Sequence, residues 1–436
     1  MESIVVRGGR KLSGEVIIDG AKNSALPLIA ATLLAENGCS RLENVPDLRD
    51  INTIIRLLEG MGAVISRQGG CLEITTSAVG NCQAPYELVK TMRASILVLG
   101  PLMARFGEAR VSLPGGCAIG ARPVNLHIKG LEMMGARISV EHGYIIGQAE
   151  RLKGADISFD VTTVTGTENL MMAAVLADGV TILRNAAREP EIVDLAAFLR
   201  KMGAQIEGDG THTITIAGVE KLVAADYQVM PDRIEAGTFM VAAGISDGDV
   251  VIKNAPLAAM AAVVTKLQEI GLLIEPLSPE EDDELHEDNR LLAGVAVRVR
   301  RGLDGLKALD VRTMPYPGFP TDMQSQAMVL LALAEGTSVI SETIFENRFM
   351  HVFELQRMGA DIEVEGRTAI VRGVAALSGA PVMASDLRAS AGLVLAGLAA
   401  EGETVMSRVY HLDRGYAGFE EKLKALGADI KRVEEN

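Results

Sequence analysis

A six-fold repeat of a short helix-ending motif is the strongest constraint on the fold of this chain. The motif is a Leu, three residues, a Gly, two residues and an Ile, as in LEGMGAVI and LKALGADI. A Gly at this position ends a helix, because it adopts the left-handed backbone conformation that other residues avoid. Successive copies are 68 to 88 residues apart, which indicates repeated structural units. The motif glycines are Gly62, Gly135, Gly203, Gly271, Gly359 and Gly427.

A second helix-ending glycine precedes each motif glycine by 23 to 28 residues. Each unit is therefore predicted to contain two helices, each followed by a strand, and to close with alternating strands such as HTITIAGV. A chain of 436 residues is too long for one simple core, so the six α/β units predict three per domain, with a boundary near Met230. The longest interval contains the acidic stretch Pro276–Arg290, which is predicted to be a solvated surface loop. The second set is Gly38, Gly107, Gly179, Gly248, Gly336 and Gly402.

Composition excludes several classes of function. A net charge of −15 argues against a nucleic-acid partner, since neutralising phosphates requires a basic surface. Aromatic residues make up only 3%, which disfavours a module that binds polymers by stacking. The apolar runs are shorter than the ~20 residues that a membrane span requires, and the start lacks an apolar secretory core. The four cysteines and six histidines form no metal-binding motif, so a reduced, cytoplasmic, metal-free protein is expected.

Charged side chains recur 14 to 16 residues before Gly38 and its equivalents, where a helix begins. Cations oppose the helix dipole there, whereas free N–H groups and neighbouring cations suit an anion. If the repeats pack as pseudo-symmetric units, these helix starts converge, which predicts a small, multiply anionic ligand. Any single member could be a surface ion pair or a helix cap, so the argument rests on the set. The set is Lys22, Arg93, Arg233, Asp322 and Arg388, with Arg122, Arg348 and Arg414 before the second helices.

One cysteine stands apart from the other three. Cys117 lies in LPGGCAIGARPVNLH, a glycine-rich loop with Arg122 five residues further on. A nearby cation lowers the pKa of a thiol and makes it an acid–base or nucleophilic group. Cys117 could therefore be catalytic or could be an ordinary cysteine without a catalytic role, and the spacing alone leaves both open. Cys39, Cys71 and Cys82 are predicted to be small buried hydrophobes.

These stretches together resemble the family of UDP-N-acetylglucosamine enolpyruvyl transferases. The resemblance covers essentially the whole chain and includes DGAKNSALP, LPGGCAIGARPVNLH, FPTDMQSQ, ENRFMH, DLRASAGLVLAG and YHLDRGY. It implies an α/β fold, a two-domain inside-out α/β barrel of six pseudo-symmetric βαβαββ-type units, three per domain. It also implies one domain from residues 1–21 and 230–436, a second from 22–229 that carries the cysteine loop, and an active site in the cleft between the domains.

The resemblance further implies a reaction and its residues. The enolpyruvyl group of phosphoenolpyruvate moves to the 3′-hydroxyl of UDP-N-acetylglucosamine and phosphate leaves, without a cofactor, as the first committed step of peptidoglycan synthesis, on which cell shape and division depend. Cys117 matches the family's general acid and the target of fosfomycin, and Asp322 matches the residue at the 3′-hydroxyl; Lys22 and Arg388 complete the catalytic set. The phosphoenolpyruvate positions are Lys22, Asn23, Arg122, Arg348, Arg388 and Arg414. The nucleotide-sugar positions are Asn23, Arg93, Arg122, Pro123, Val124, Asn125, Leu126, Thr162, Thr163, Val164, Thr165, Asp322 and Ile344.

Two other functions remain as alternatives. One is enolpyruvyl transfer to shikimate 3-phosphate, which the cysteine loop and the Arg122 run disfavour. The other is a catalytically silent paralogue that senses nucleotide sugar. Such a paralogue is expected to have lost at least one residue of the set, and Lys22, Cys117 and Asp322 are all present.

Overall fold

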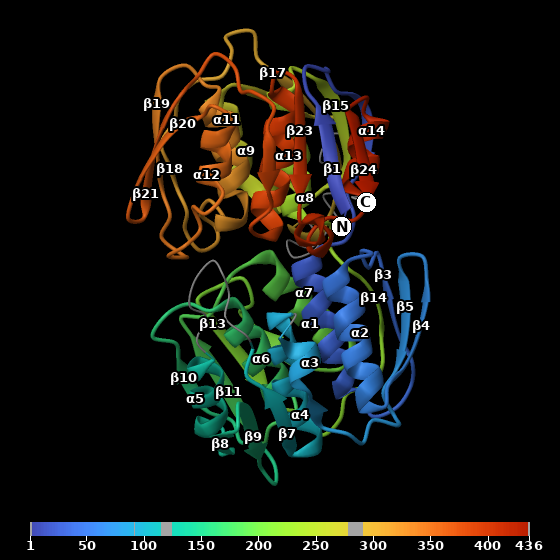
Figure 1. Ribbon diagram of the computed structural model, residues 1–436. Helices are drawn as coiled ribbons and strands as arrows, with labels where there is room; N and C mark the ends of the chain where they lie inside the picture. Colours follow the sequence, from blue (N-terminus) through green and yellow to red (C-terminus); the bar gives the residue numbers. More distant parts are fainter. Residues whose placement is uncertain (1, 91, 115–123, 278–290, 435–436) are drawn as a thin grey trace. The chain divides into compact units, whose positions relative to one another are not determined.

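The computed structural model describes residues 2–90, 92–114, 124–277 and 291–434 (Figure 1). Within them the chain forms two compact units. The first unit contains residues 2–19 and most of 231–434, and the second contains residues 20–114 and 124–230. Among the described residues, no helix is both long and apolar enough to cross a membrane. The predicted acidic loop falls almost entirely on residues 278–290, which lie outside the described part of the chain.

The described strands form six four-stranded sheets with one common pairing pattern. In each sheet one outer pair of strands is parallel and the other two pairs are antiparallel, as when β10 pairs with β11, β11 with β13, and β13 with β12. This common pattern confirms the six repeated units predicted from the sequence. The second unit holds β14(Asp226–Gln228)-β3(Ser40–Glu43)-β5(Cys71–Thr75)-β4(Val64–Gln68), β6(Gln83–Ala84)-β7(Glu108–Ser112)-β9(Tyr144–Gln148)-β8(Arg137–Glu141) and β10(Asp156–Ser158)-β11(Val180–Arg184)-β13(Thr213–Ala217)-β12(Gln205–Glu207). The first unit holds β16(Leu272–Pro276)-β17(Val295–Arg301)-β15(Asp249–Ala255)-β2(Ser13–Ile17), β18(Val311–Arg312)-β19(Thr337–Ser341)-β21(Thr368–Arg372)-β20(Asp361–Glu365) and β22(Pro381–Met383)-β23(Glu403–Ser407)-β1(Glu2–Arg7)-β24(Asp429–Glu434).

Two kinds of helix alternate along the chain. Helices such as α8 and α13 are rich in Ala, Gly and aliphatic residues on all faces, and they are buried along nearly their whole length. Helices such as α2 carry one apolar stripe and lie on the outside, with their other face in water. In the first unit α11 and α13 lie inside, with the β18–β21 sheet on one side and β1, β23 and β24 on the other (Figure 1). The first unit has α8(Arg233–Ile245), η3(Leu257–Met260), α9(Ala261–Ile270), η4(Thr321–Met323), α11(Gln324–Ala332), α12(Val352–Arg357), α13(Leu387–Ala399), η5(Val409–Arg414) and α14(Phe419–Ala425).

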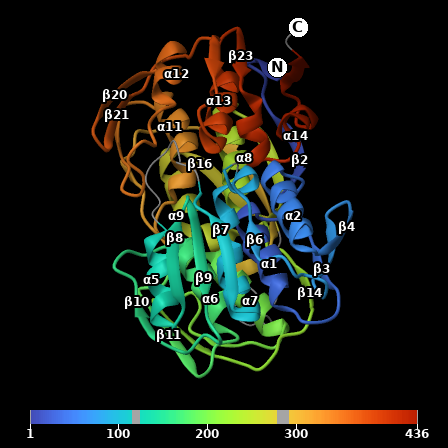
Figure 2. The same ribbon diagram turned by 60° about the horizontal axis from the view of Figure 1, so that its bottom comes forward.

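The second unit repeats this arrangement with its own helices, and Figure 2 shows its strands β7, β8 and β9 side by side. Its inner helices also begin where the charged or polar residues of the sequence were found, since α1 begins at Lys22 and η2 at Arg93. The helix starts are therefore as predicted. The helices are α1(Lys22–Ala31), η1(Thr32–Leu34), α2(Arg49–Met61), α3(Tyr86–Val89), η2(Arg93–Val98), α4(Leu99–Phe106), α5(Asn125–Met133), α6(Val164–Ala174) and α7(Pro190–Lys201).

All six motif glycines end a helix in a left-handed conformation, with φ between 88° and 120°. At Gly62 the amide bonds back to the carbonyl of Glu59, and the next amide, of Ala63, bonds to that of Leu58. This pair of hydrogen bonds is the Schellman motif, which explains the constant spacing of Leu and Gly.

In the second set Gly107 is the C-cap of α4, in the left-handed conformation. The other glycines were wrongly predicted to end helices: four have a positive φ but follow helices that end earlier, at Leu34, Ala174, Ala332 and Ala399, and at Gly248 it is Asp247 that takes the left-handed conformation. Gly248 instead lies so close to the Leu12 carbonyl that a Cβ would be 2.5 Å from its oxygen.

The cysteine prediction also needs a correction. Cys39 is exposed and Cys71 and Cys82 are partly exposed, so none of the three is a core residue. Cys71 opens β5 at the point where that strand leaves a turn, and its Sγ accepts a hydrogen bond from Arg41 Nε at 3.3 Å. The prediction assumed that a residue as small as cysteine is buried. Cys71 is instead partly exposed, because it lies at a strand end next to a turn, and such ends lie at the surface.

We expect Gly100→Ala to lower the free energy of unfolding by about 1–3 kcal/mol, because a Cβ there would overlap the backbone and side chain of Asn169. Gly100 is buried in α4, and its amide donates to the Asn169 side chain in α6. Gly60→Ala is the matched control, because Gly60 is exposed in α2 and a Cβ there meets nothing within 4 Å. Urea unfolding of both variants checks the prediction, and equal stabilities would contradict it.

Candidate active site

Asp322 lies between two buried arginines in the first unit. Arg348 Nη2 donates to Asp322 Oδ1 at 3.0 Å, and Arg388 Nε donates to Asp322 Oδ2 at 3.2 Å. The arginine side chains are 4% and 1% exposed, whereas Asp322 is 25% exposed. Three residues that are distant in the sequence therefore meet in one cluster, with its carboxylate open to solvent.

Helix starts and turns hold this cluster in place. Asp322 is in η4, immediately before α11, and Arg388 is in the first turn of α13. The N-cap of α13 is Asp386, whose Oδ1 accepts from the amides of Arg388 and Ala389 at 2.8 and 3.0 Å. Since the Asp386 carboxylate is engaged with the helix end, it leaves the guanidinium of Arg388 to Asp322.

Arg388 keeps one donor unused. Its Nη2 is buried and has no hydrogen-bond partner among the residues that the structure describes. A guanidinium has five N–H donors, and a buried donor without an acceptor is costly. Two arginines share one carboxylate here, so the cluster has both the positive charge and the free donor that an anion requires.

The remaining predicted residues of the first unit adjoin this cluster. Arg414 ends η5, and the two residues after it contact Arg388: the Gly415 carbonyl accepts from Arg388 Nη1 at 3.5 Å, and the Tyr416 ring lies 5.2 Å from the guanidinium. Ile344 is tied to the same region through Glu342, which accepts from the Ile344 amide and from Thr321 Oγ1, both at 2.8 Å.

Two histidines near the cluster were missed in the sequence. His351 is buried, and neither ring nitrogen has a partner in the described part of the chain. Burial, together with the neighbouring Arg348, lowers its pKa to about 4 against the opposing effect of Asp386. Burial followed by Arg414 likewise lowers the pKa of His411. His351 is therefore neutral at pH 7, which leaves the positive charge of the cluster on the arginines.

In the second unit, Lys22 is paired with a buried carboxylate. Lys22 Nζ lies 3.1 Å from Asp50 Oδ2, and the side chains are only 8% and 6% exposed. Lys22 opens α1 and Asp50 lies in the first turn of α2, so two helix starts meet at this ion pair. Asn23 is the next residue of α1, and its side chain is half-buried. Asp50 was not predicted, because nothing in its local sequence distinguishes it from an ordinary first-turn acid.

His127 connects several of the predicted nucleotide-sugar positions. Asn169 Nδ2 lies 2.9 Å from His127 Nδ1, and Thr165 Oγ1 lies 3.4 Å from His127 Nε2. An amide NH₂ can only donate, so Nδ1 must accept and the ring carries its proton on Nε2. Burial, followed by the charge of Arg93, lowers the pKa of His127 to about 4. Arg93 and Thr165 are thus gathered around one neutral imidazole that the prediction omitted, although it ends the quoted cysteine-loop stretch.

The other predicted residues lie at helix starts near this histidine. Val124 is the N-cap of α5, and Asn125 and Leu126 form its first turn. Thr163 is the N-cap of α6, and its Oγ1 accepts from the Gly166 amide at 3.2 Å. Thr162 Oγ1 donates to Asn185 Oδ1 at 3.1 Å. Val164 opens α6. Cys117, Arg122 and Pro123 lie outside the described residues.

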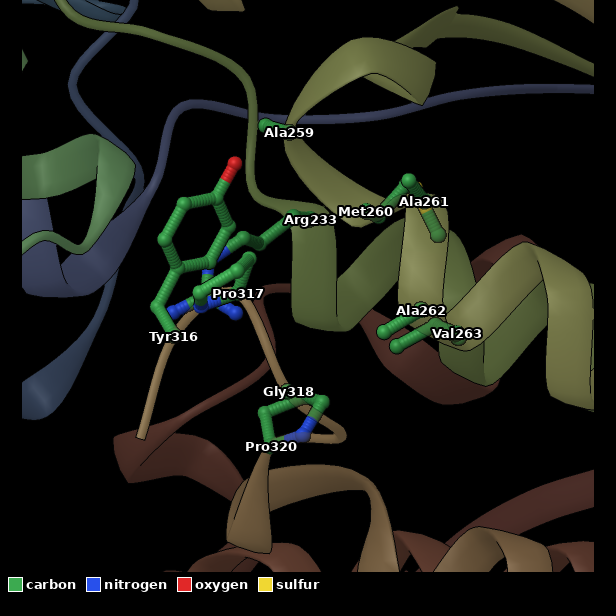
Figure 3. Close-up of a pocket in the computed structure, with 10 residues that line it drawn as sticks. All are labelled: Arg233, Ala259, Met260, Ala261, Ala262, Val263, Tyr316, Pro317, Gly318 and Pro320. Carbon is green, nitrogen blue, oxygen red and sulfur yellow. The ribbon is translucent and has the colours of Figure 1, made fainter. Parts of the chain in front are cut away.

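The first unit also has a small cavity, lined in part by Pro320, the N-cap of η4. Figure 3 shows Arg233, Tyr316 and Pro317 close together, with Gly318 and Pro320 below them and Ala261, Ala262 and Val263 on the helix to the right. Its volume of about 20 Å³ corresponds to a single water molecule. None of the residues predicted to bind phosphoenolpyruvate or the nucleotide sugar lines it. This cavity is therefore too small for a substrate.

Comparison with known proteins decides the family. UDP-N-acetylglucosamine 1-carboxyvinyltransferases from Geobacter metallireducens and Magnetococcus marinus are each 58% identical to the chain, covering 100% and 99% of it and 100% of each relative. The chain belongs to the UDP-N-acetylglucosamine 1-carboxyvinyltransferase family. The broader family described as EPSP synthase (3-phosphoshikimate 1-carboxyvinyltransferase) matches residues 6–423.

Solved structures confirm the enolpyruvyl transferase fold predicted from the sequence. The enolpyruvyl transferase NikO from Streptomyces tendae is 26% identical, with a TM-score of 0.86 over 100% of this chain and 99% of that one. An EPSP synthase from Acinetobacter baumannii is 20% identical with a TM-score of 0.76 over the full length of both chains, and it supports the fold alone. The chain is thus an enzyme of the transferase class.

We expect the His127 imidazole of this family member to stay neutral from pH 8 down to about pH 5, because its pKa is lowered to about 4. The unfolded chain, with a pKa of about 6.5, binds more protons between these values, so the stabilisation present above pH 6.5 is lost as the pH falls towards 4. The pKa shift of His127 corresponds to a loss of roughly 3 kcal/mol in the free energy of unfolding at low pH. Imidazole chemical shifts of His127, assigned with a His127→Gln variant, check this. A His127 signal that titrates near pH 6.5 would contradict it.

Proposed function

We propose that this chain transfers the enolpyruvyl group of phosphoenolpyruvate to the 3′-hydroxyl of UDP-N-acetylglucosamine and releases phosphate. The observation that carries the proposal is the Asp322 carboxylate, which is partly exposed between two buried arginines, one of them with an unused donor. The names of the relatives, 58% identical over the full chain, supply the substrate. The acceptor needs a base, and phosphoenolpyruvate needs several cations, so one cluster serves both requirements.

The reaction assigns a balanced step to each group. The 3′-hydroxyl oxygen bonds to C2 of phosphoenolpyruvate, Asp322 accepts the hydroxyl proton, and Cys117 delivers a proton to C3. The tetrahedral adduct then returns a proton from C3 to the Cys117 thiolate while the bond between C2 and the phosphate oxygen breaks, and the leaving phosphate takes the proton held by Asp322. Cations lower the barrier to this step by stabilising the negative charge of the phosphate and the carboxylate. For phosphoenolpyruvate these are Lys22, Arg122, Arg348, Arg388 and Arg414, with the amide of Asn23.

The nucleotide sugar is assigned to the residues around His127 and to the start of α11. The neutral imidazole, held by Asn169, orients the Thr165 hydroxyl through its Nε2–H, and Arg93 provides a cation beside it. A nucleoside diphosphate needs both kinds of group. The proposed contacts are Asn23, Arg93, Arg122, Pro123, Val124, Asn125, Leu126, Thr162, Thr163, Val164, Thr165, Asp322 and Ile344.

Further parts of the proposal concern the setting of the reaction. The product feeds peptidoglycan synthesis, and therefore cell-wall growth, cell shape and division.

Cys39, Cys71 and Cys82 are free thiols, which fits a reducing, cytoplasmic compartment. Fosfomycin is proposed to alkylate Cys117. The proposed reaction uses residues from both proposed domains. Lys22 and Cys117 belong to the domain of residues 22–229. Arg348, Arg388 and Arg414 belong to the domain formed by residues 1–21 and 230–436.

Mass spectrometry of the small molecules tests the proposal directly. Purified protein is incubated with phosphoenolpyruvate and UDP-N-acetylglucosamine, without added metal, and released phosphate is measured in parallel. An enolpyruvyl adduct of the nucleotide sugar in equal amount to the phosphate is expected. Product only with shikimate 3-phosphate would instead support the related activity, and binding of nucleotide sugar without product would indicate a silent sensor.

A further inference from the structure

Asp194 is a buried carboxylate that no step of the proposed reaction uses. It lies in α7 and is 1% exposed. Its Oδ2 accepts from Ser24 Oγ and from the Met230 amide, the latter at 3.3 Å, and its Oδ1 accepts from Tyr227 Oη at 2.6 Å. Three donors from two distant parts of the chain therefore converge on one side chain.

These donors lie at both ends of the second unit. The unit begins at Gly20 and ends at Met230. Ser24 is the third residue of α1, and Tyr227 and Met230 lie in and just after β14. The two ends are also joined directly, since the Ala21 amide donates to the Met230 carbonyl at 2.7 Å. Asp194 thus fastens the last strand of the unit to the first helix.

The start of α1 depends on this anchor. Its N-cap is Ala21, which has no side chain that could cap the helix. Lys22 and Asn23, the first two residues of α1, follow directly and carry the groups assigned to phosphoenolpyruvate. Ser24 comes next and is fully buried, so its bond to Asp194 fixes the turn that presents them. A displacement of about 1 Å in such a group can cost on the order of 10²-fold in rate.

The carboxylate needs its charge for this task. An ionised carboxylate accepts hydrogen bonds only, whereas a protonated one must donate one of its own. Burial, together with Glu191 of the same helix, raises the pKa of Asp194 to about 6, against the lowering effect of its bonds to Ser24, Tyr227 and Met230. Asp194 is therefore mostly ionised at pH 7 and takes up a proton as the pH falls through about 6.

We propose that Asp194 is a positioning residue, which acts through Ser24 to hold Lys22 and Asn23 in the orientation that binds phosphoenolpyruvate. The inference rests on the proposed function. It predicts that breaking the Asp194–Ser24 bond raises KM for phosphoenolpyruvate more than it changes KM for the nucleotide sugar. A purely structural anchor would instead lower stability and leave both KM values unchanged in the folded protein.

Steady-state kinetics of four variants of the full chain test the proposal. Asp194→Asn and Ser24→Ala should each lower kcat/KM for phosphoenolpyruvate on the order of 10-fold, and the double variant should lose no more than Asp194→Asn alone. Tyr227→Phe is the matched control, because it removes a hydrogen bond to Oδ1 of the same carboxylate, whereas Ser24 bonds to Oδ2. It should stay within about twofold of wild type in kcat/KM while lowering the melting temperature. If Asp194→Asn does not fold, Ser24→Ala against Tyr227→Phe decides the question.

The pH profile gives an independent readout. The fall of kcat/KM below about pH 6 that Asp194 protonation causes should disappear in both Asp194→Asn and Ser24→Ala, although the second variant keeps the carboxylate. Unchanged KM values in Ser24→Ala, or additive losses in the double variant, would overturn the positioning role. Lack of turnover in the wild-type protein would contradict the proposed function instead, so the two failures are distinguishable.

Discussion

Replacing Asp322 by Asn is expected to lower kcat by about 10²–10⁴-fold, the usual contribution of a general base. The amide keeps the shape of the side chain but cannot accept the proton of the acceptor hydroxyl. It also turns an NH₂ group towards one of the two arginines, whose N–H groups lie at 3.0 and 3.2 Å from the carboxylate in the native protein. Turnover measured at saturating concentrations of both substrates checks the prediction.

The control for this variant is another Asp→Asn change. Asp304 pairs with Lys307 at 3.4 Å, but its side chain is 85% exposed, so Asp304→Asn should leave turnover and stability nearly unchanged. Because Asp322 is itself partly exposed, the Asp322→Asn variant should remain folded, which a thermal melt can show. A folded Asp322→Asn protein that keeps more than about a tenth of wild-type kcat would remove Asp322 from the role of general base.

The helix ends were predictable because they depend on local interactions. A Schellman motif places its Leu and its Gly four residues apart, and both bonds close within one turn, so the sequence pattern contains the whole motif. Gly62 and Gly203 show it in the structure, with left-handed φ values of 109° each. At Gly248 the same pattern misled, because a glycine can also be required by a neighbour distant in the sequence, here the Leu12 carbonyl.

The repeat pattern did not predict which strands pair with one another. The first two strands join different sheets: β1 lies between β23 and β24, whereas β2 pairs with β15. The second unit is completed in the same way, since β14 pairs with β3 from the start of the chain. Such pairings are set by which sheet edge is left open after the other strands have paired, so spacing along the chain cannot specify them.

The residues of the candidate site were predictable or not for the same reason. The cations were predictable because they recur at one position of the repeat, and Lys22, Arg93 and Arg388 all lie at helix starts. Their surroundings were not, because Asp50, the partner of Lys22, and Asn169, the partner of His127, acquire their roles only through contacts far apart in the sequence. A sequence pattern therefore found the charges proposed to bind substrate better than the groups that surround them.

Lys22→Met should lower kcat/KM for phosphoenolpyruvate by about 10²–10³-fold, the usual loss when one preorganised positive group is removed. The same change also leaves Asp50 buried without this cation, and breaking a buried ion pair costs about 3–5 kcal/mol. A loss of activity in the single variant therefore mixes two effects. A second substitution at Asp50 separates them.

In the double variant Lys22→Met/Asp50→Asn, the buried charge is removed together with its partner. Its melting temperature should recover most of the loss seen in Lys22→Met, because neither side chain is then ionised in the interior. Its kcat/KM should stay as low as that of Lys22→Met, since the missing group is the cation proposed to bind phosphoenolpyruvate. Recovery of activity along with stability would show that Lys22 acts only by neutralising Asp50, and the assignment of Lys22 to the substrate would then be wrong.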